Sequence, residues 1–414
     1  MKKKIIISFS IVILLFGVII AILPRVNNVH ANTEIKVISG QAINSLNNNA
    51  NDIEQGILNS LIDQLRNLDL SNLEAMLQNL DDRYNIFGTG SFRDKIDAIV
   101  NGNYFTNFDN IFSAVIGLFF DGLVSAMPVL LTIVAVTILS TIINGMKSSS
   151  ASSGVSDLVH FVSYSVVVLV IVVAFVQIFH VTQTTLSTMT ALMEASFPVL
   201  LTLLTAVGAV SSVSIYQPLV AVLINGVATI FTYFLYPLFI INFVFIIISN
   251  LSTTFKLNKF SDLINSIFKW VIGFVLTLFT AFLSIQGISA GRFDSVSIRA
   301  TRFAIKSYIP ILGGFISEGF DFIILSSVLI KNAVGVGVLV MLFVTVLVPV
   351  VQILVFKFGL QLVGAVLEPV GNPRVSSFCT SCAKILVYPI AIMLGVAFMF
   401  LITVALIMTT ANVF

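Results

Sequence analysis

The chain has 414 residues, of which 57% are hydrophobic and only 10% are charged, and its mean hydropathy is +1.06. Soluble domains carry about 25% charged residues, so this composition argues against a water-soluble fold. Apolar runs of roughly 20 residues recur along the chain, which indicates an all-α, polytopic membrane protein. Residues 32–110 hold eleven acidic and five basic side chains, whereas eight acidic and twelve basic ones follow residue 110. We therefore expect an acidic, water-facing N-terminal region before the membrane region.

The segment 1–31 has the pattern of a secretory signal peptide. Lys2, Lys3 and Lys4 precede the apolar run 5–23, and the stretch ends in Val29-His30-Ala31, which resembles a cleavage site. A retained anchor helix is the alternative, because the apolar run could just span a bilayer. In either case the positive-inside rule keeps the lysines in the cytoplasm and places the chain after Ala31 outside.

Residues 32–110 are expected to form short amphipathic helices in this extracytoplasmic region. Leucine and isoleucine recur at helical spacing between Leu58 and Leu68. Ser71–Glu74 has the pattern of a capping box, and Ser91–Asp94 predicts a further helix that ends near Gly102. A small helical bundle resting on the membrane and a partner-docking module both fit this pattern.

We expect about seven spans, the first five within 111–287 and the last two within 333–414. Their predicted limits are 122–146, 158–180, 196–214, 218–249, 267–287, 333–356 and 385–409. The fourth is too long for a simple crossing and contains Pro237, which lacks a backbone donor. That span is expected to be kinked, strongly tilted or split into two half-helices.

Seven crossings that start outside place 144–157, 288–332 and the C-terminus in the cytoplasm. The loop 181–195, which lacks Lys and Arg, then falls outside, as the positive-inside rule prefers. Lys256 and Lys259 also fall outside, against the rule. Splitting the fourth span would bring them inside but would move the more strongly charged 288–332 segment out.

The segment 288–332 carries a group of basic residues that we call the basic ridge: Arg292, Arg299, Arg302 and Lys306. The last three lie at i, i+3 and i+7, so a helix would carry them on one face. That face could bind anionic headgroups, at about 1 kcal/mol per residue, or acidic side chains of a neighbouring subunit. With Lys331, these are the candidate docking or gating residues.

Several small or helix-breaking residues flank the ridge. Pro310 is expected to end the ridge helix, and Gly313 with Gly314 would let the chain turn into the bilayer. Gly287 and Gly291 form a GxxxG pattern that suits close helix packing.

Acidic residues within apolar segments are costly and tend to be functional or paired. Glu318 and Asp321 lie at i and i+3 in an apolar segment interrupted by glycines, and Glu368 is the third candidate intramembrane polar residue. A re-entrant element lining a cavity and an amphipathic helix lying flat on the membrane both fit 309–332. Asp121 and Glu194 stand beside span ends, where solvated carboxylates are expected.

Motifs for chemistry are scarce. The chain contains no GxxxxGK[ST] or HExxH pattern, and His160 and His180 bracket one predicted span. Cys379 and Cys382 form a CxxC before a membrane helix, which fits a pair of small interfacial residues better than a redox site. We expect no enzyme activity, cofactor, metal or nucleic-acid binding.

Several motifs resemble the stage III sporulation protein AE family. They are Gln286-Gly287, Ser289-Ala290, Asp294, Ser297, Ile309-Pro310, Gly313, "LIKNAVG" at 329–335, Pro349 and "EPVG" at 368–371. The segment 1–110 agrees in layout rather than in motif, and Cys379 and Cys382 are not part of the pattern.

The resemblance implies a conduit or scaffold subunit of the channel-like complex that joins mother cell and forespore in endospore-forming bacteria. It implies a place in the mother-cell membrane around the forespore, with the region after Ala31 facing the intermembrane space. The implied partners are ring-forming subunits of the same operon, a forespore-side membrane protein and a secretion-type ATPase. A stand-alone secondary transporter for a small metabolite is the alternative, although no internal repeat supports it.

Overall fold

A computed structural model describes residues 68–84, 90–100, 108–145, 153–251, 257–308, 313–370 and 373–410. The predicted signal peptide and the helix expected over most of 58–68 lie outside these ranges. The described part is helical and contains no strand, which confirms the all-α class. It contains six helical stretches that are long and apolar enough to cross a membrane, which confirms a polytopic membrane protein.

The long helices exceed the thickness of a bilayer. Helix α6 (Ser153–Ala206), α9 (Asn258–Tyr308) and α10 (Gly313–Leu367) have 54, 51 and 55 residues. At about 1.5 Å per residue each is roughly 75–80 Å long, whereas the hydrocarbon core is about 30 Å thick. A large part of each helix therefore lies beyond the hydrocarbon, unless the helix is strongly tilted.

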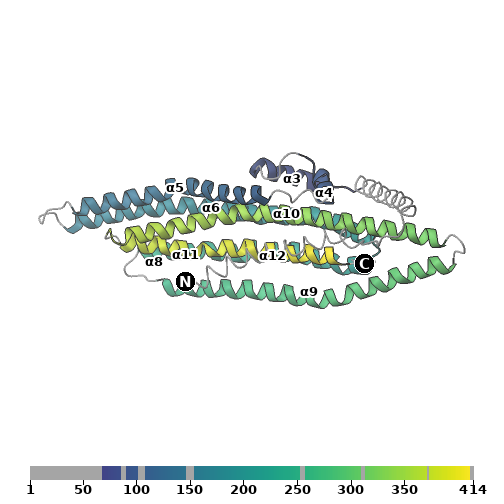
Figure 1. Ribbon diagram of the computed structural model, residues 1–414. Coiled ribbons are helices and arrows are strands. Elements are labelled where there is room, and N and C mark those ends of the chain that lie inside the picture. The colour runs from purple at the N-terminus through teal and green to yellow at the C-terminus, as the bar shows by residue number, and fades with distance from the viewer. Residues whose placement is uncertain are drawn as a thin grey trace, which may run out of the picture.

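The chain runs back and forth between two ends of an elongated bundle (Figure 1). At one end, which we call end A, α5 (Phe108–Gly145), α8 (Tyr236–Leu251) and α10 finish, and α6, α9 and α11 (Pro373–Ile385) begin. At the other, end B, α6 and α9 finish, and α7 (Val210–Thr229) and α10 begin. The segments flanking 144–157 and 288–332 thus lie at opposite ends, which differs from their predicted placement on one side.

The cause of this difference is the predicted loop 181–195, which is helical and lies inside α6. Four of its threonines donate to the carbonyl one turn earlier, for example Thr182 Oγ1 to Ile178 O and Thr185 Oγ1 to Val181 O, both at 2.7 Å; the other two are Thr188 and Thr190. These bonds satisfy the hydroxyl groups within the helix, so the hydroxyls do not need water. The second and third predicted spans therefore merge, and six apolar stretches replace seven in the described part.

Helix α6 ends at Ala206, within the third predicted span, 196–214. The prediction did not use Gly208 as a helix-ending signal. Gly208 has φ of +89°, a conformation that costs glycine little. Its N–H donates to Thr205 O at 2.8 Å, and Ala209 N–H donates to Leu204 O at 3.1 Å. This is the Schellman pattern that closes a helix C-terminus.

The expected distortion at Pro237 takes a specific form. The segment Ile230–Leu235 forms a π-helical turn, η1, between α7 and α8. Proline removes one backbone donor and its ring crowds the preceding turn, and the rare π turns occur mostly as single-turn bulges inside α-helices. The segment 210–251 is thus one distorted helix rather than two half-helices.

The segment 313–332 is the first part of α10, which continues without a break to Leu367. It is neither a re-entrant element nor a separate surface helix, so both expectations for it were wrong. Gly313 and Gly314 stand at the helix start, as a turn signal would, but Gly319 does not interrupt the helix. Pro310 lies outside the described residues, between the end of α9 and the start of α10.

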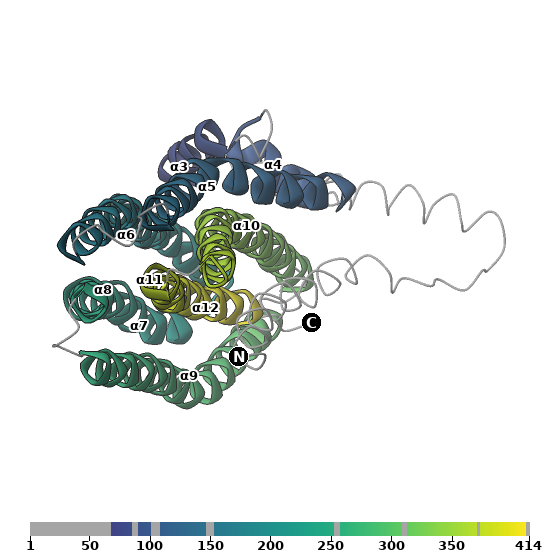
Figure 2. The ribbon, with the colours of Figure 1, turned by 90° about the vertical axis from the view of Figure 1, so that its left-hand side faces the viewer.

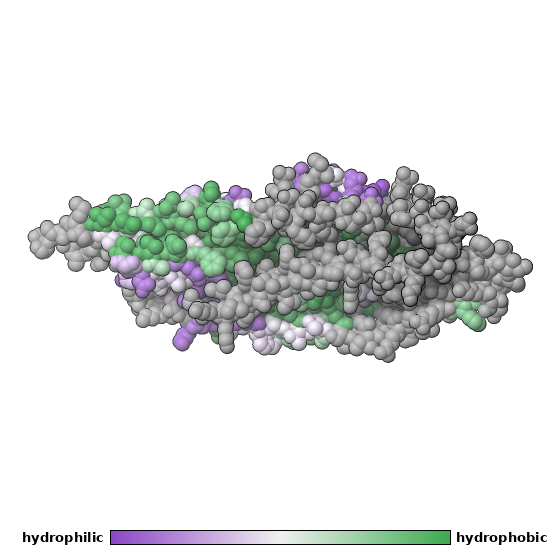
Figure 3. Space-filling model, in the orientation of Figure 1, coloured by the Kyte–Doolittle hydropathy of each residue, from purple (hydrophilic) through white to green (hydrophobic). Residues whose placement is uncertain are grey.

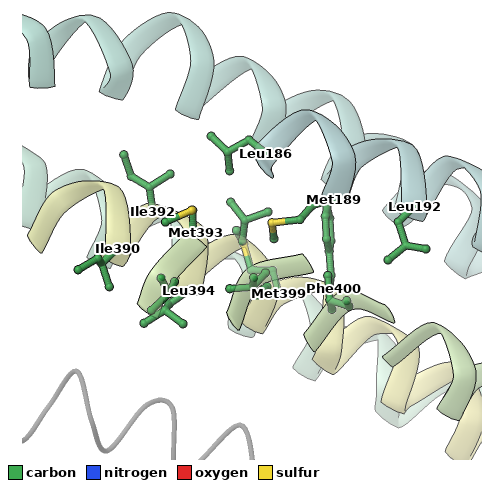
Figure 4. Packing of buried hydrophobic residues seen from close by; sticks show 14 of the residues in the cluster. Leu186, Met189, Leu192, Ile390, Ile392, Met393, Leu394, Met399 and Phe400 are labelled. Carbon is green, nitrogen blue, oxygen red and sulfur yellow. The ribbon is translucent and has the colours of Figure 1, made fainter. Parts of the chain in front are cut away.

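Helices α10 and α12 (Val387–Thr409) occupy the centre, as the end-on view shows (Figure 2). The most apolar window is 67% buried in α10 and 72% buried in the α11–α12 stretch, against 17–33% in the other apolar stretches. Between α6 and α12 the core is filled by Leu, Ile, Met and Phe side chains, including Met189, Met393 and Phe400 (Figure 4).

Two short helices of the acidic region pack on the side of the bundle. They are α3 (Ser71–Tyr84) and α4 (Phe92–Val100). Leu73, Leu77 and Ile96 are buried, and a Cβ at Gly337 of α10 would lie 3.1 Å from the Phe92 ring. This unit is therefore docked on the long helices through an apolar face.

Both short helices have polar caps. At α4, Ser91 N–H donates to Asp94 Oδ2 at 2.8 Å and Asp94 N–H donates to Ser91 Oγ at 3.2 Å, which is the reciprocal pattern of a capping box. These bonds hold the pKa of Asp94 below its ordinary value. At α3 the cap is Asp69, which accepts from Ser71 N–H and Oγ, and not Ser71 itself as predicted.

Candidate functional site

The basic ridge lies on the second half of α9, close to end B. The helix is continuous from Asn258 to Tyr308, so Arg299, Arg302 and Lys306 share one face, as predicted from their spacing. The side chains of all four ridge residues lie outside the described part. The helix ends just before Pro310, in agreement with the expected stop.

Lys331 is separated from the ridge by burial. It is fully buried in α10, and its Nζ donates to the carbonyl oxygen of Thr410, just after α12. A cation at a helix C-terminus is favoured by the helix dipole. Thr410 Oγ1 also shares a hydrogen bond of 2.8 Å with the Tyr216 hydroxyl on α7. Lys331 therefore joins α7, α10 and α12 within the chain and does not present its charge at the surface.

The candidate acids are distributed over both ends. Glu318 and Asp321 lie in α10 near end B, on adjacent turns of a continuous helix, and their side chains are not described. Glu368 is exposed in the turn after α10, at end A. Asp121 and Glu194 are both exposed, as expected of solvated carboxylates.

A polar cluster between α8 and α9 was not singled out from the sequence. Asn242 is fully buried. Its Nδ2 donates to Asn265 Oδ1 at 2.8 Å, and Ser261 Oγ donates to its Oδ1 at 2.7 Å. Interhelical bonds of this kind hold membrane helices together. The signal available beforehand was an amide within the apolar run 238–248.

Glycines bring the central helices close together. A Cβ at Gly364 of α10 would lie 2.6 Å from Thr380 Oγ1 of α11, and one at Gly359 would overlap Leu130 Cδ1 of α5. Small residues allow such close approach in membrane bundles. The predicted packing glycines Gly287 and Gly291 lie within α9, but their surroundings are not described.

The described residues offer no set of three or more His, Cys, Asp or Glu that could hold a metal ion. Cys379 and Cys382 are free and buried in α11. The neighbouring Phe378 ring lies 5.6 Å from the Tyr164 ring of α6. The pair thus belongs to the packing of α11, which contacts α10 and α8, near end A.

The fold defines a multi-pass helical membrane protein whose polar groups tie its helices together. The family description "Stage III sporulation protein AE" matches residues 90–411, and the chain belongs to this family. A curated protein of that name from Bacillus subtilis (strain 168) is 27% identical over 198 residues, which are 48% of this chain and 49% of the relative. The aligned region thus spans about half the length of that relative. No solved structure matches the chain.

Proposed function

We propose that this chain is an integral-membrane scaffold or conduit subunit of the complex that links mother cell and forespore, and that forespore development after engulfment requires it. The observation that carries the proposal is the family match over residues 90–411. The family name supports a role in sporulation, and the six apolar stretches support a multi-pass membrane protein.

The packed centre of the bundle favours a scaffold over a pore through a single copy. Large side chains such as Phe175, Phe197 and Phe400 are buried between the helices, and such packing leaves few voids larger than a water molecule. A conduit would therefore form between copies or between subunits. A stand-alone transporter has no support from the family match.

The proposed partners are the other subunits of the same operon, including ring-forming proteins and a secretion-type ATPase, with a membrane protein on the forespore side. The proposed location is the mother-cell membrane around the forespore. In this role the chain catalyses no reaction, and the basic ridge is a docking or gating element.

The test is purification from sporulating cells in mild detergent. Recovery of the chain together with ring-forming and ATPase subunits supports the proposal. Recovery of the chain alone, with substrate transport by that pure protein in liposomes, would contradict it and favour a transporter. A tagged, unrelated multi-pass protein from the same cells provides the background of non-specific co-purification.

The role of the acids near end B is tested separately. If Glu318 and Asp321 line a water-filled path, then Glu318→Cys and Asp321→Cys in a cysteine-free parent should react with a water-soluble thiol reagent. Complete inertness of both positions before denaturation would show that they are buried against protein or lipid.

A further inference from the structure

The exposed face of α6 changes character along a single continuous helix. Toward end A its outermost side chains are large and apolar; Leu169 is 64% exposed and Val173 is 61% exposed. Beyond Val176 no large apolar side chain of this helix is exposed. The exposed positions there include Gln183, Ser187, Ala191, Glu194, Pro198 and Thr202.

The apolar part of this face covers most of a hydrocarbon core. Its described exposed apolar positions run from Phe161 to Val176, and the exposed Gln177 and His180 follow. At the helical rise per residue this stretch is at least about 22 Å long, against about 30 Å for a typical bilayer interior.

Neighbouring helices change character near the same level. Asp121 is exposed on α5, and Gln177 is exposed on α6. The number of residues from Asp121 to the end of α5 at Gly145 equals the number from the start of α6 at Ser153 to Gln177. Both of those helix termini are at end A. Between Asp121 and the end of α5 the exposed large side chains are apolar, including Val124, and Ile116, Phe119 and Phe120 are also exposed just beyond Asp121 toward end B. The apolar surface of α5 therefore extends one to two turns past the level at which it ends on α6.

The α7–α8 segment repeats the pattern. The ring of Phe179 on α6 lies 5.8 Å from that of Tyr236, which places the two positions at one level. From Tyr233 toward end A the exposed large residues of this segment are apolar or aromatic, including Val244. Toward end B, α7 exposes Ser214, Gln217 and Asn225, with Val210 and Val222 as the large apolar exceptions.

The remaining long helix is consistent with this level. On α9 the exposed Trp270 and Phe274 stack at 5.3 Å on the part of the helix toward end A. Phe303, which is 71% exposed, is an apolar exception on the other part. The same helix continues to Tyr308 and includes the basic ridge in this second part. Figure 3 shows the hydrophobic surface gathered over α5 and α6 toward end A, and hydrophilic residues over α3 and α4.

We infer that the bilayer surrounds only the end A half of the bundle, and that the end B half projects from the membrane on the side that carries α3 and α4. The position of α4 fixes that side. A Cβ at Gly122, next to Asp121, would contact Gln352 and Val355 of α10, whereas α4 packs at Gly337. The helical rise places Gly337 about 25 Å beyond the boundary, toward end B.

The distribution of basic residues assigns this projecting half to the non-cytoplasmic side. Lys147, Lys256, Lys259 and Arg374 lie in or beside the short connections at end A. Lys2, Lys3 and Lys4, which precede the apolar run 5–23, keep the N-terminus in the cytoplasm, so the region after Ala31 that includes α3 and α4 lies outside. The basic ridge is therefore at the far tip of the projecting half.

Single cysteines on one stripe of α6 test this arrangement in the full chain. The parent carries Cys379→Ala and Cys382→Ala. Ser187→Cys and Thr202→Cys lie on the projecting half, and Val173→Cys, closer to end A on the same stripe, is the matched control. Lys259→Cys reports on end A. The probe is a membrane-impermeant maleimide, applied to intact protoplasts, to disrupted membranes and to denatured protein.

We expect Ser187→Cys and Thr202→Cys to react in intact protoplasts, and Lys259→Cys to react only after disruption. Val173→Cys should react only after denaturation, because a thiol in hydrocarbon forms no thiolate. Inertness of both projecting positions before denaturation would overturn the half-embedded arrangement. Reaction of those positions only after disruption would overturn the assigned side. Neither outcome depends on a role in sporulation.

Discussion

Gly364 marks a close approach between α10 and α11, and its replacement by alanine should loosen this contact. The new Cβ would lie 2.6 Å from Thr380 Oγ1 and 3.2 Å from the Ser376 carbonyl oxygen. The second neighbour is backbone and cannot rotate away. The helices must therefore separate, which also lengthens the 2.7 Å bond from Ser376 Oγ to the Gly364 carbonyl oxygen.

The expected cost of Gly364→Ala combines two effects. Overpacking of a tight contact costs about 1–3 kcal/mol, and weakening one hydrogen bond adds up to about 1 kcal/mol. We therefore expect the free energy of unfolding to fall by roughly 1–4 kcal/mol. The measurement is equilibrium unfolding of the purified protein in detergent micelles, followed by loss of helical circular dichroism.

A second substitution separates this clash from a general intolerance of change. Thr380→Ala removes the atom at 2.6 Å, so the double variant should recover at least about 1 kcal/mol relative to Gly364→Ala alone. Gly395→Ala is the matched control, because a Cβ at this buried glycine meets nothing within 4 Å. Unchanged stability of Gly364→Ala, or strict additivity in the double variant, would refute the reasoning.

Three further predictions concern other parts of the molecule. Asn242→Leu should lower the free energy of unfolding by about 1 kcal/mol, because two interhelical hydrogen bonds are lost; unchanged micelle unfolding would contradict this. Ser91→Ala should raise the pKa of Asp94, measured by carboxyl NMR. Since that pKa is depressed in the folded chain, its stabilisation exists above the unfolded pKa and is lost as pH falls through the folded pKa. Backbone amides of α4 should therefore exchange hydrogen faster in Ser91→Ala than in the parent at neutral pH. This difference in exchange rate should become smaller in acid, where Asp94 is protonated in both proteins. Arg299→Glu combined with Arg302→Glu should block complex assembly or spore formation while membrane insertion continues; normal spores would reject the docking role.

The amino-acid sequence predicted the class of the protein and the periodic features of its helices. Hydropathy and low charge content are properties of local segments, so they indicated membrane helices without any knowledge of packing. The helix start at Ser91–Asp94 and the helical spacing of Arg299, Arg302 and Lys306 also depend only on residues within one or two turns. The structure confirms the helix that begins after Ser91 and a continuous helix through the three basic positions, whereas the capping box predicted at Ser71–Glu74 was wrong.

The sequence did not determine which predicted spans join into one helix, which polar side chains are buried, or which segments lie at the same end of the bundle. Within 181–195 the hydroxyls of Thr182, Thr185, Thr188 and Thr190 donate to carbonyls one turn earlier, and hydropathy alone does not show that these polar groups are satisfied within a helix. Lys331 looked like a surface cation, yet the carbonyl that accepts its hydrogen bond belongs to Thr410, in a distant part of the chain.

Sequence alone therefore determined that this chain is a helical membrane protein with an acidic, capped N-terminal region. Only the tertiary structure decided that α6 is one helix, that α10 and α12 form the centre, and that the basic ridge lies at the opposite end from Lys259. The physical reason is that composition sets the preference of each segment for lipid or water. Which face meets lipid depends on the helices packed against the other faces, and these come from distant parts of the chain.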